Sequence, residues 1–448
     1  MRVIKWLGLG LATLFVLVVL TYGVLLVINR ADEPPSAIAL AFAELIDEVA
    51  APYQPENAVP YFAGLRAGRG VDPRAVGEAW LDWSRLSYEE QLAQDAPGGG
   101  VSLRLLIPSE RPALDDLMGT CGEPQPACLS LLDDQSAALS AELAELDWLM
   151  ARYDRLLRHS AWQEPATESY LSIPAYGEAL TLNQLFGLHV WRLAHAGEVE
   201  RALDELDREA LFWRMALVET RLLVGKMLIA EMLKRNMLWT NAVLRKADYA
   251  GHVPMVWQQE LTPEERSMQR SFAGELHLAA SEMTQRTSED LDLFDALLRS
   301  LENSLFQPQA TANLFAARYH DVHQALSVPY PQLEAELNRL REREQEMGEA
   351  GIFRLYNPVG HIFGQMTSGS HAHYGLRIAD LEGLRRLMLL ADALRDGDVA
   401  APTVPSRLAG AEFRNPYTGD PFSWDADSKA LIFNGLAPGE NGLYTVPY

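Results

Sequence analysis

The sequence predicts a mainly α-helical protein with an N-terminal transmembrane helix, a multi-helix, bundle-like extracytoplasmic domain and a small C-terminal β-hairpin module. Three observations predict this fold class. An uncharged apolar run from Trp6 to Ile28 opens the chain, amphipathic helical periodicity fills most of the sequence up to Arg395, and Gly, Pro and Asn cluster after it. With 448 residues, 48% of them hydrophobic, the chain can also bury a sizeable core.

The N-terminal apolar run is long enough to cross a bilayer. Its 23 consecutive uncharged residues, rich in Leu and Val, cover the roughly 30 Å hydrocarbon core when they are helical. A cleaved signal peptide has a shorter apolar region followed by small residues at the cleavage site, whereas this run continues through Val24 to Val27. We therefore predict an uncleaved signal anchor over residues 1–30, with residues 6–28 in the membrane.

The charges that flank this run predict its orientation. Arg2 and Lys5 precede the span, whereas the single basic residue after it, Arg30, is followed closely by Asp32 and Glu33. Because basic flanks stay on the cytoplasmic side, we expect a cytoplasmic N-terminus and a periplasmic body, in a bacterial inner membrane. The later apolar stretch 211–233 contains five charged residues, each costing about 2.5 to 3.5 kcal/mol at mid-bilayer, so a second span is excluded.

The rest of the chain divides into a linker, a helical domain and a cap. Residues 31–36, with two prolines, predict a short stiff linker. Residues 37–396 predict the helical domain, whose 3-4 apolar seams favour an internal bundle over an intermolecular coiled coil. Its predicted helices are Ala37 to Val49, Pro73 to Leu92, Leu129 to His159, Glu178 to Ala194, Val199 to Lys246, Thr262 towards Thr287, Gln309 to Leu326, Pro331 to Met347 and Ile378 to Leu394.

Residues 397–448 form the Pro/Gly-rich cap. Two short apolar runs, Pro421 to Asp425 and Lys429 to Phe433, flank a polar turn and predict a β-hairpin. Because a lone hairpin is marginal in water, its aromatic residues should pack on the helical body. The tryptophans of the helical segments are likewise expected in the core rather than in a ligand groove.

The net charge of −23, from 38 basic and 61 acidic residues, argues against nucleic-acid binding, because an acidic surface repels phosphate backbones. The two cysteines, Cys121 and Cys128, lie in the turn-forming segment CGEPQPAC. Outside the cytoplasm they predict a structural disulfide, which would contribute about 2.5 kcal/mol by restricting the unfolded chain. Their spacing differs from the C-x-x-C of redox centres.

Two histidine pairs are the remaining candidates for chemistry, since the sequence has no nucleotide-binding, zincin or α/β-hydrolase motif. His320 and His323 are three residues apart on one predicted helix, and His371 and His373 lie in a Gly/Ser-rich segment. If the two pairs converged, they could hold zinc with an open position for water. The alternative is four unrelated, solvated histidines. The loop from Asn357 to Gly364, with Asn-Pro and two glycines, predicts a corner between helices.

Several segments carry a resemblance to known proteins: Gln307 to Asn313, Asn357 to Gly360, Ala379 to Leu394 and Asn415 to Phe422. They resemble a group of uncharacterised bacterial single-pass envelope proteins with a helical body. The last segment, NPYTGDPF, also resembles the C-terminal hairpin of type II secretion pseudopilins. The N-terminus departs from that family because it lacks the prepilin cleavage site and the glutamate that follows it. The resemblance implies a small β-module used for packing or contact.

An anchored body without a catalytic motif favours a scaffold or accessory subunit of an envelope complex, with another envelope protein as its partner. The alternative is a membrane-tethered, zinc-dependent hydrolase that uses His320, His323, His371 and His373.

Overall fold

The computed structural model describes residues 2–46, 53–94, 96–97, 117–174, 176–285, 304–351, 355–366 and 371–448. It is mainly helical, with 67% helix and 4% strand, which confirms the mainly α-helical part of the predicted fold class. The predicted ends of two helices, at Val49 and Thr287, lie outside the described residues.

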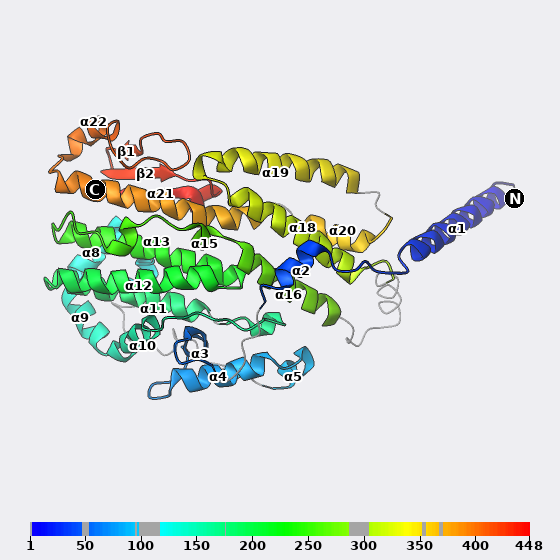
Figure 1. Ribbon diagram of the computed structural model, residues 1–448, viewed down its shortest axis with the longest axis horizontal. Coiled ribbons are helices and arrows are strands. Elements are labelled where there is room, and N and C mark those ends of the chain that lie inside the picture. Colours follow the sequence, from blue (N-terminus) through cyan, green and yellow to red (C-terminus); the bar gives the residue numbers. More distant parts are fainter. Residues whose placement is uncertain are drawn as a thin grey trace.

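The apolar helix α1 (Arg2–Ile28) projects away from the body (Figure 1). Its segment Gly8–Ile28 is long and apolar enough to cross a membrane, and none of that apolar segment is buried against the protein. Large side chains along it, such as Phe15 and Val27, are therefore about two thirds exposed to solvent. Exposure of so many neighbouring apolar side chains is unfavourable in water and favourable in lipid.

The core of the body is built around α13 (Leu223–Lys246). This helix packs against α11 (Tyr176–His195), α12 (Val199–Glu219), α16 (Gln269–Gln285) and α21 (His371–Asp396). Close packing of α11 on α13 requires a glycine, because a Cβ at Gly187 would lie 2.2 Å from the indole nitrogen of Trp239. The predicted tryptophan core is confirmed: Trp162 and Trp213 are among the largest fully buried side chains.

The prediction of a single helix from Val199 to Lys246 is wrong, because the helix is interrupted at residues 220–222. Two carboxylates, the buried Glu164 and the partly buried Glu275, satisfy backbone N–H groups that the break frees. Glu164 accepts from the N–H of Arg221 (2.6 Å), and Glu275 accepts from that of Leu223 (2.9 Å). The break is thus stabilised by residues distant in sequence, and local periodicity could not reveal it.

Other predicted long helices are also divided. The segment from Leu129 to His159 forms α8 (Pro126–Asp134), α9 (Ser136–Ala144) and α10 (Asp147–Leu157). Within the segment from Pro73 to Leu92, α4 (Pro73–Ser84) ends before Ser87. The capping box of Ser87 then starts a second helix, α5 (Tyr88–Ala93). The remaining helices are α2 (Ala37–Ala43), α3 (Ala58–Ala63), α14 (Met255–Gln258), α15 (Pro263–Arg266), α18 (Pro308–Leu326), α19 (Tyr330–Gly351), α20 (Pro358–Met366) and α22 (Val404–Leu408).

The C-terminal module is a three-stranded antiparallel sheet in the order β1-β2-β3. The predicted hairpin is confirmed as β1 (Ser423–Asp425) and β2 (Ala430–Asn434), and the sequence analysis missed β3 (Leu443–Pro447). The sheet packs on α21, as expected, because the ring of Phe433 fills the space beside Gly383.

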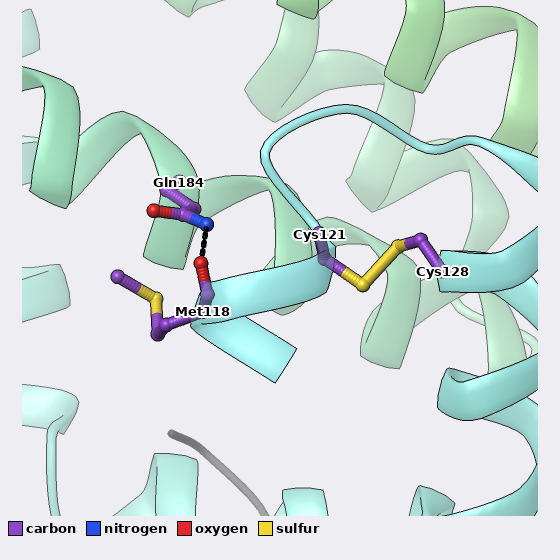
Figure 2. The surroundings of a disulfide bond; sticks show 4 residues. All are labelled: Met118, Cys121, Cys128 and Gln184. Atoms are coloured by element: carbon purple, nitrogen blue, oxygen red, sulfur yellow. Dashed lines mark hydrogen bonds between the residues drawn. A yellow bond between two sulfur atoms is a disulfide. The ribbon is translucent and has the colours of Figure 1, made fainter. Parts of the chain in front are cut away.

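The predicted disulfide is confirmed: Cys121 and Cys128 are bonded, with their Cα atoms 5.0 Å apart. Figure 2 shows its neighbourhood, where the side-chain amide of Gln184 in α11 donates to the carbonyl of Met118 (2.6 Å). Lys234 of α13 forms an ion pair with Glu123 inside the disulfide loop. The disulfide therefore fixes a loop that contacts α13, next to a preceding segment that contacts α11.

Candidate functional site at the base of the apolar helix

The end of α1 is joined to the body by a buried asparagine. Asn29 is only 4% exposed, and its amide group donates to the carbonyls of Leu25 and Leu355 (both 2.8 Å). The same side chain accepts from the backbone N–H of Asn357 (2.7 Å), and its own carbonyl accepts from Gln307. The residue directly after the apolar helix is thus bound to two segments that lie far along the chain.

Asn357 forms the centre of this junction. Its side-chain oxygen accepts from the N–H groups of Gln307 (3.0 Å) and Gly360 (3.2 Å), and its amide donates to Thr311 (2.9 Å). Its φ of 50° lies in the left-handed region, which asparagine tolerates better than most residues. Its side chain caps α20 (Pro358–Met366), so the loop predicted from Asn357 to Gly364 is wrong after its first residue: the chain turns at Asn357, and positions 358–364 are helical. A Cβ at Gly360 would lie 2.1 Å from the Thr311 hydroxyl oxygen.

The segment predicted to be a linker is also hydrogen-bonded to the body. The carboxylate of Asp32 accepts from the N–H groups of Gln309 (2.7 Å) and Ala310 (2.9 Å), at the start of α18. A carboxylate at a helix N-terminus satisfies free donors and complements the helix dipole. Asn313, one turn into α18, accepts from the N–H of Ser36 (2.8 Å). We call Asn29, Asp32, Gln307, Thr311, Asn313 and Asn357 the anchor junction.

The chemistry of the anchor junction suits a mechanical role. Its side chains are amides, one hydroxyl and one carboxylate, and each has a hydrogen-bond partner within the part of the chain that the structure describes. The one carboxylate, Asp32, is held by two backbone N–H groups at the start of α18, and the junction residues include no His, Cys, Lys or Ser. The junction therefore fixes the direction of α1 relative to α18 and α20 instead of performing a reaction.

Replacing Asn357 tests the junction. Asn357→Ala leaves the N–H groups of Gln307 and Gly360 without their acceptor and forces alanine into a left-handed conformation. We expect a loss of about 2 to 4 kcal/mol in the free energy of unfolding, measured by urea titration in detergent. Asn357→Gly relieves the backbone strain alone and should recover about 1 kcal/mol of that loss.

The exposed Asn338→Ala on α19 is the matched control and should change little. If Asn357→Ala unfolds at the same urea concentration as Asn338→Ala, the junction does not stabilise the fold.

A second polar group lies inside the helical core, around Glu209 of α12. Its carboxylate accepts from the hydroxyl of Tyr153 (2.5 Å) and from the amides of Asn183 (3.0 Å) and Asn236 (2.9 Å). The indole of Trp213 in turn donates to the Tyr153 oxygen (2.9 Å). Burial raises the pKa of Glu209 to about 7, although these hydrogen bonds favour its charged form.

A buried lysine lies at the break between α12 and α13. The amine of Lys226 donates to the carbonyls of Leu217 (2.6 Å) and Glu265 (3.2 Å), which are near the ends of two helices. The carboxylate of Glu265 is bound by Arg214 instead (2.8 Å). Burial without a carboxylate hydrogen bond lowers the pKa of Lys226 to about 7. The amine therefore acts as a helix cap.

The shifted pKa values of Glu209 and Lys226 would suit acid–base catalysis, but both side chains are at most 1% exposed. A hollow between α13 and β3 is lined by residues such as Gln125, Arg245 and Thr445, and neither group reaches it. These interior groups are accounted for by the packing and the helix ends that they satisfy.

The structure does not gather the four predicted histidines into a metal site. The ring of His371 packs edge-on against Tyr319 (4.9 Å between centroids), and burial lowers the pKa of His323. His320 and His373 are partly buried. Among the described residues there is no group of three or more His, Cys, Asp or Glu that could hold a metal ion. The zinc hypothesis stays a prediction without geometric support.

No protein-family model, curated protein or solved structure matches the chain. The function proposed below is therefore inferred from the geometry of this chain alone.

Local patterns marked Asn357 as a corner, and the resemblance covered both Asn357 to Gly360 and Gln307 to Asn313, but neither pointed to Asn29 and Asp32 as partners of these segments. The signal available was a lone asparagine directly after an apolar run, which is too common to predict a contact.

Proposed function

We propose that the chain is a single-pass membrane protein whose helical body lies outside the cytoplasm and serves as a scaffold or accessory subunit of an envelope complex. The observation that carries the proposal is the combination of a membrane-length α1, most of which is exposed, with the anchor junction at its base. A flexible tether needs no such junction, whereas a scaffold benefits from a body held at a fixed angle to the bilayer.

Two further observations support the compartment. The structure contains the Cys121–Cys128 disulfide. Structural disulfides persist in oxidising compartments such as the bacterial periplasm and are rare in the cytoplasm. Arg2 and Lys5, in the first turns of α1 before its apolar segment, favour a cytoplasmic N-terminus. A bacterial inner membrane with a periplasmic body meets both conditions.

The interior of the body supports a structural role. Buried ionisable groups such as Glu209, Glu164 and Lys226 are bound to helix ends and core side chains and are closed off from solvent.

The test is recovery of a partner from crosslinked cells. Full-length protein with a C-terminal tag should return the same partner at near-stoichiometric amounts in repeated purifications. A fusion of residues 1–30 to an unrelated soluble domain is the control, and it should not return that partner. Repeated recovery of the bait alone, with the crosslinker shown to work on another complex, would contradict the scaffold role.

A further inference from the structure

Part of the body lies alongside the last turns of α1 instead of beyond its end. Tyr22 precedes Asn29 by seven residues, which is about 10 Å along a helix. Its hydroxyl is 2.8 Å from the hydroxyl oxygen of Ser304. Tyr22 and Leu25 are accordingly half-buried, whereas most of α1 is exposed. Because about 20 helical residues cover the roughly 30 Å hydrocarbon core, a span that begins at Trp6 ends near Leu25, and Ser304 then lies within about one helical turn of the lipid interface.

The short helix α20 lies at the same end of the body, next to the base of α1 (Figure 1). Its position is fixed by the anchor junction, because Asn29 bonds the carbonyl of Leu355 and the N–H of Asn357 just before α20 begins. Its Phe363 packs edge-on against Phe306, two residues after Ser304 (5.8 Å between centroids). The 304–306 segment and α20 thus form one continuous surface beside α1.

This surface is apolar and displays large side chains. Leu355 is 53% exposed and Ile362 is 57% exposed. Helix α20 contains no Asp, Glu, Lys or Arg. Exposed apolar side chains on an uncharged helix suit the boundary between lipid headgroups and acyl chains. The body's strong negative charge elsewhere disfavours contact with anionic lipid.

We propose that α20, Leu355 and the 304–306 segment are immersed in the outer interface of the same bilayer that α1 spans. The proposed partner is thus a lipid surface. Apolar side chains bind it, and the binding does not depend on a basic patch that attracts anionic headgroups. The inference rests on the membrane anchoring proposed above. Together, α1 and this interfacial surface give two points of attachment, which fix the orientation of the body as well as its distance from the membrane.

The test uses full-length protein in nanodiscs of zwitterionic lipid, with single cysteines labelled by an environment-sensitive fluorophore. The native cysteines are bonded to each other and do not react. Ile362→Cys and Leu355→Cys report on the proposed surface. Leu443→Cys, with 54% exposure on β3, is the matched control, and Val16→Cys reports on α1. Lipids that carry a spin label near the headgroup quench fluorophores at the interface.

We expect lipid quenching at positions 362 and 355 to exceed that at position 443 by at least threefold, with correspondingly weaker quenching by aqueous iodide. Equal quenching at 362, 355 and 443, with position 16 shielded from iodide, would overturn the interfacial surface and leave the anchor intact. Iodide access at position 16 would overturn both proposals. Iodide protection at 362 without lipid quenching would mean that a second protein copy covers the surface, and the lipid proposal would be wrong.

Discussion

Glu209→Ala should lower the free energy of unfolding by about 3 to 5 kcal/mol, the cost typical of a buried polar network that loses a central partner. The substitution removes the acceptor for Tyr153, Asn183 and Asn236 and leaves a cavity between α10, α12 and α13. Urea unfolding of the full chain in detergent, followed by tryptophan fluorescence, measures the change. A loss below about 1 kcal/mol would show that the network adds little stability.

The conservative variant Glu209→Gln separates hydrogen bonding from ionisation. It keeps one side-chain oxygen as an acceptor and should lose less stability than alanine. The folded-state pKa of Glu209, about 7, is above the ordinary value of 4.5. The stability that this shift contributes is fully present below pH 4.5 and is lost as the pH rises towards 7. The stability of the wild type relative to Glu209→Gln should therefore fall across pH 4.5 to 7, and a constant difference would contradict the raised pKa.

Asp380→Ala should loosen the C-terminal module from α21. The Asp380 carboxylate accepts from the hydroxyl of Tyr417 (2.5 Å) and from the backbone N–H groups of Leu436 (2.9 Å) and Ala437 (3.0 Å). Alanine leaves these three donors without that acceptor, so we expect a loss of about 3 kcal/mol. Limited proteolysis should then cleave within residues 397–448 at least tenfold faster than in the wild type.

Asp380→Asn is the matched variant, since it keeps the shape and one acceptor oxygen. Its cleavage rate should lie between those of the wild type and the alanine variant. Burial raises the pKa of Asp380 to about 6, so its neutral form contributes stability below pH 3.8 that is lost as the pH rises through 6. If Asp380→Ala resists proteolysis as the wild type does, the module is held by its apolar contacts alone.

Local sequence patterns predicted the helices that are determined by residues close together in sequence. The uncharged run from Trp6 to Ile28 predicted α1, and apolar periodicity predicted α11, α18 and α21 to within a few residues except at the start of α21. That start, at His371, lies in a Gly/Ser-rich stretch that reads as a loop. Strand β3 was not predicted because it is only five residues long and because it is a strand through its pairing with β2.

The remaining features depend on residues that are distant in sequence. The break between α12 and α13 needs Glu164 and Glu275, which are 57 residues before Arg221 and 52 residues after Leu223. The anchor junction joins Asn29 to Asn357, a separation of 328 residues. A single sequence contains no local signal for such pairs, because either residue alone is compatible with an exposed loop.

The central claim is that α1 spans a membrane and places the body outside the cytoplasm. The most direct test is the accessibility of single cysteines to a membrane-impermeant maleimide in spheroplasts of bacteria that express the full chain. A cysteine replacing Leu443, on the body, should be labelled in intact spheroplasts, and one replacing Val3, before the apolar segment of α1, only after lysis. Labelling of Val3→Cys from outside, or of Leu443→Cys only after lysis, would contradict the account.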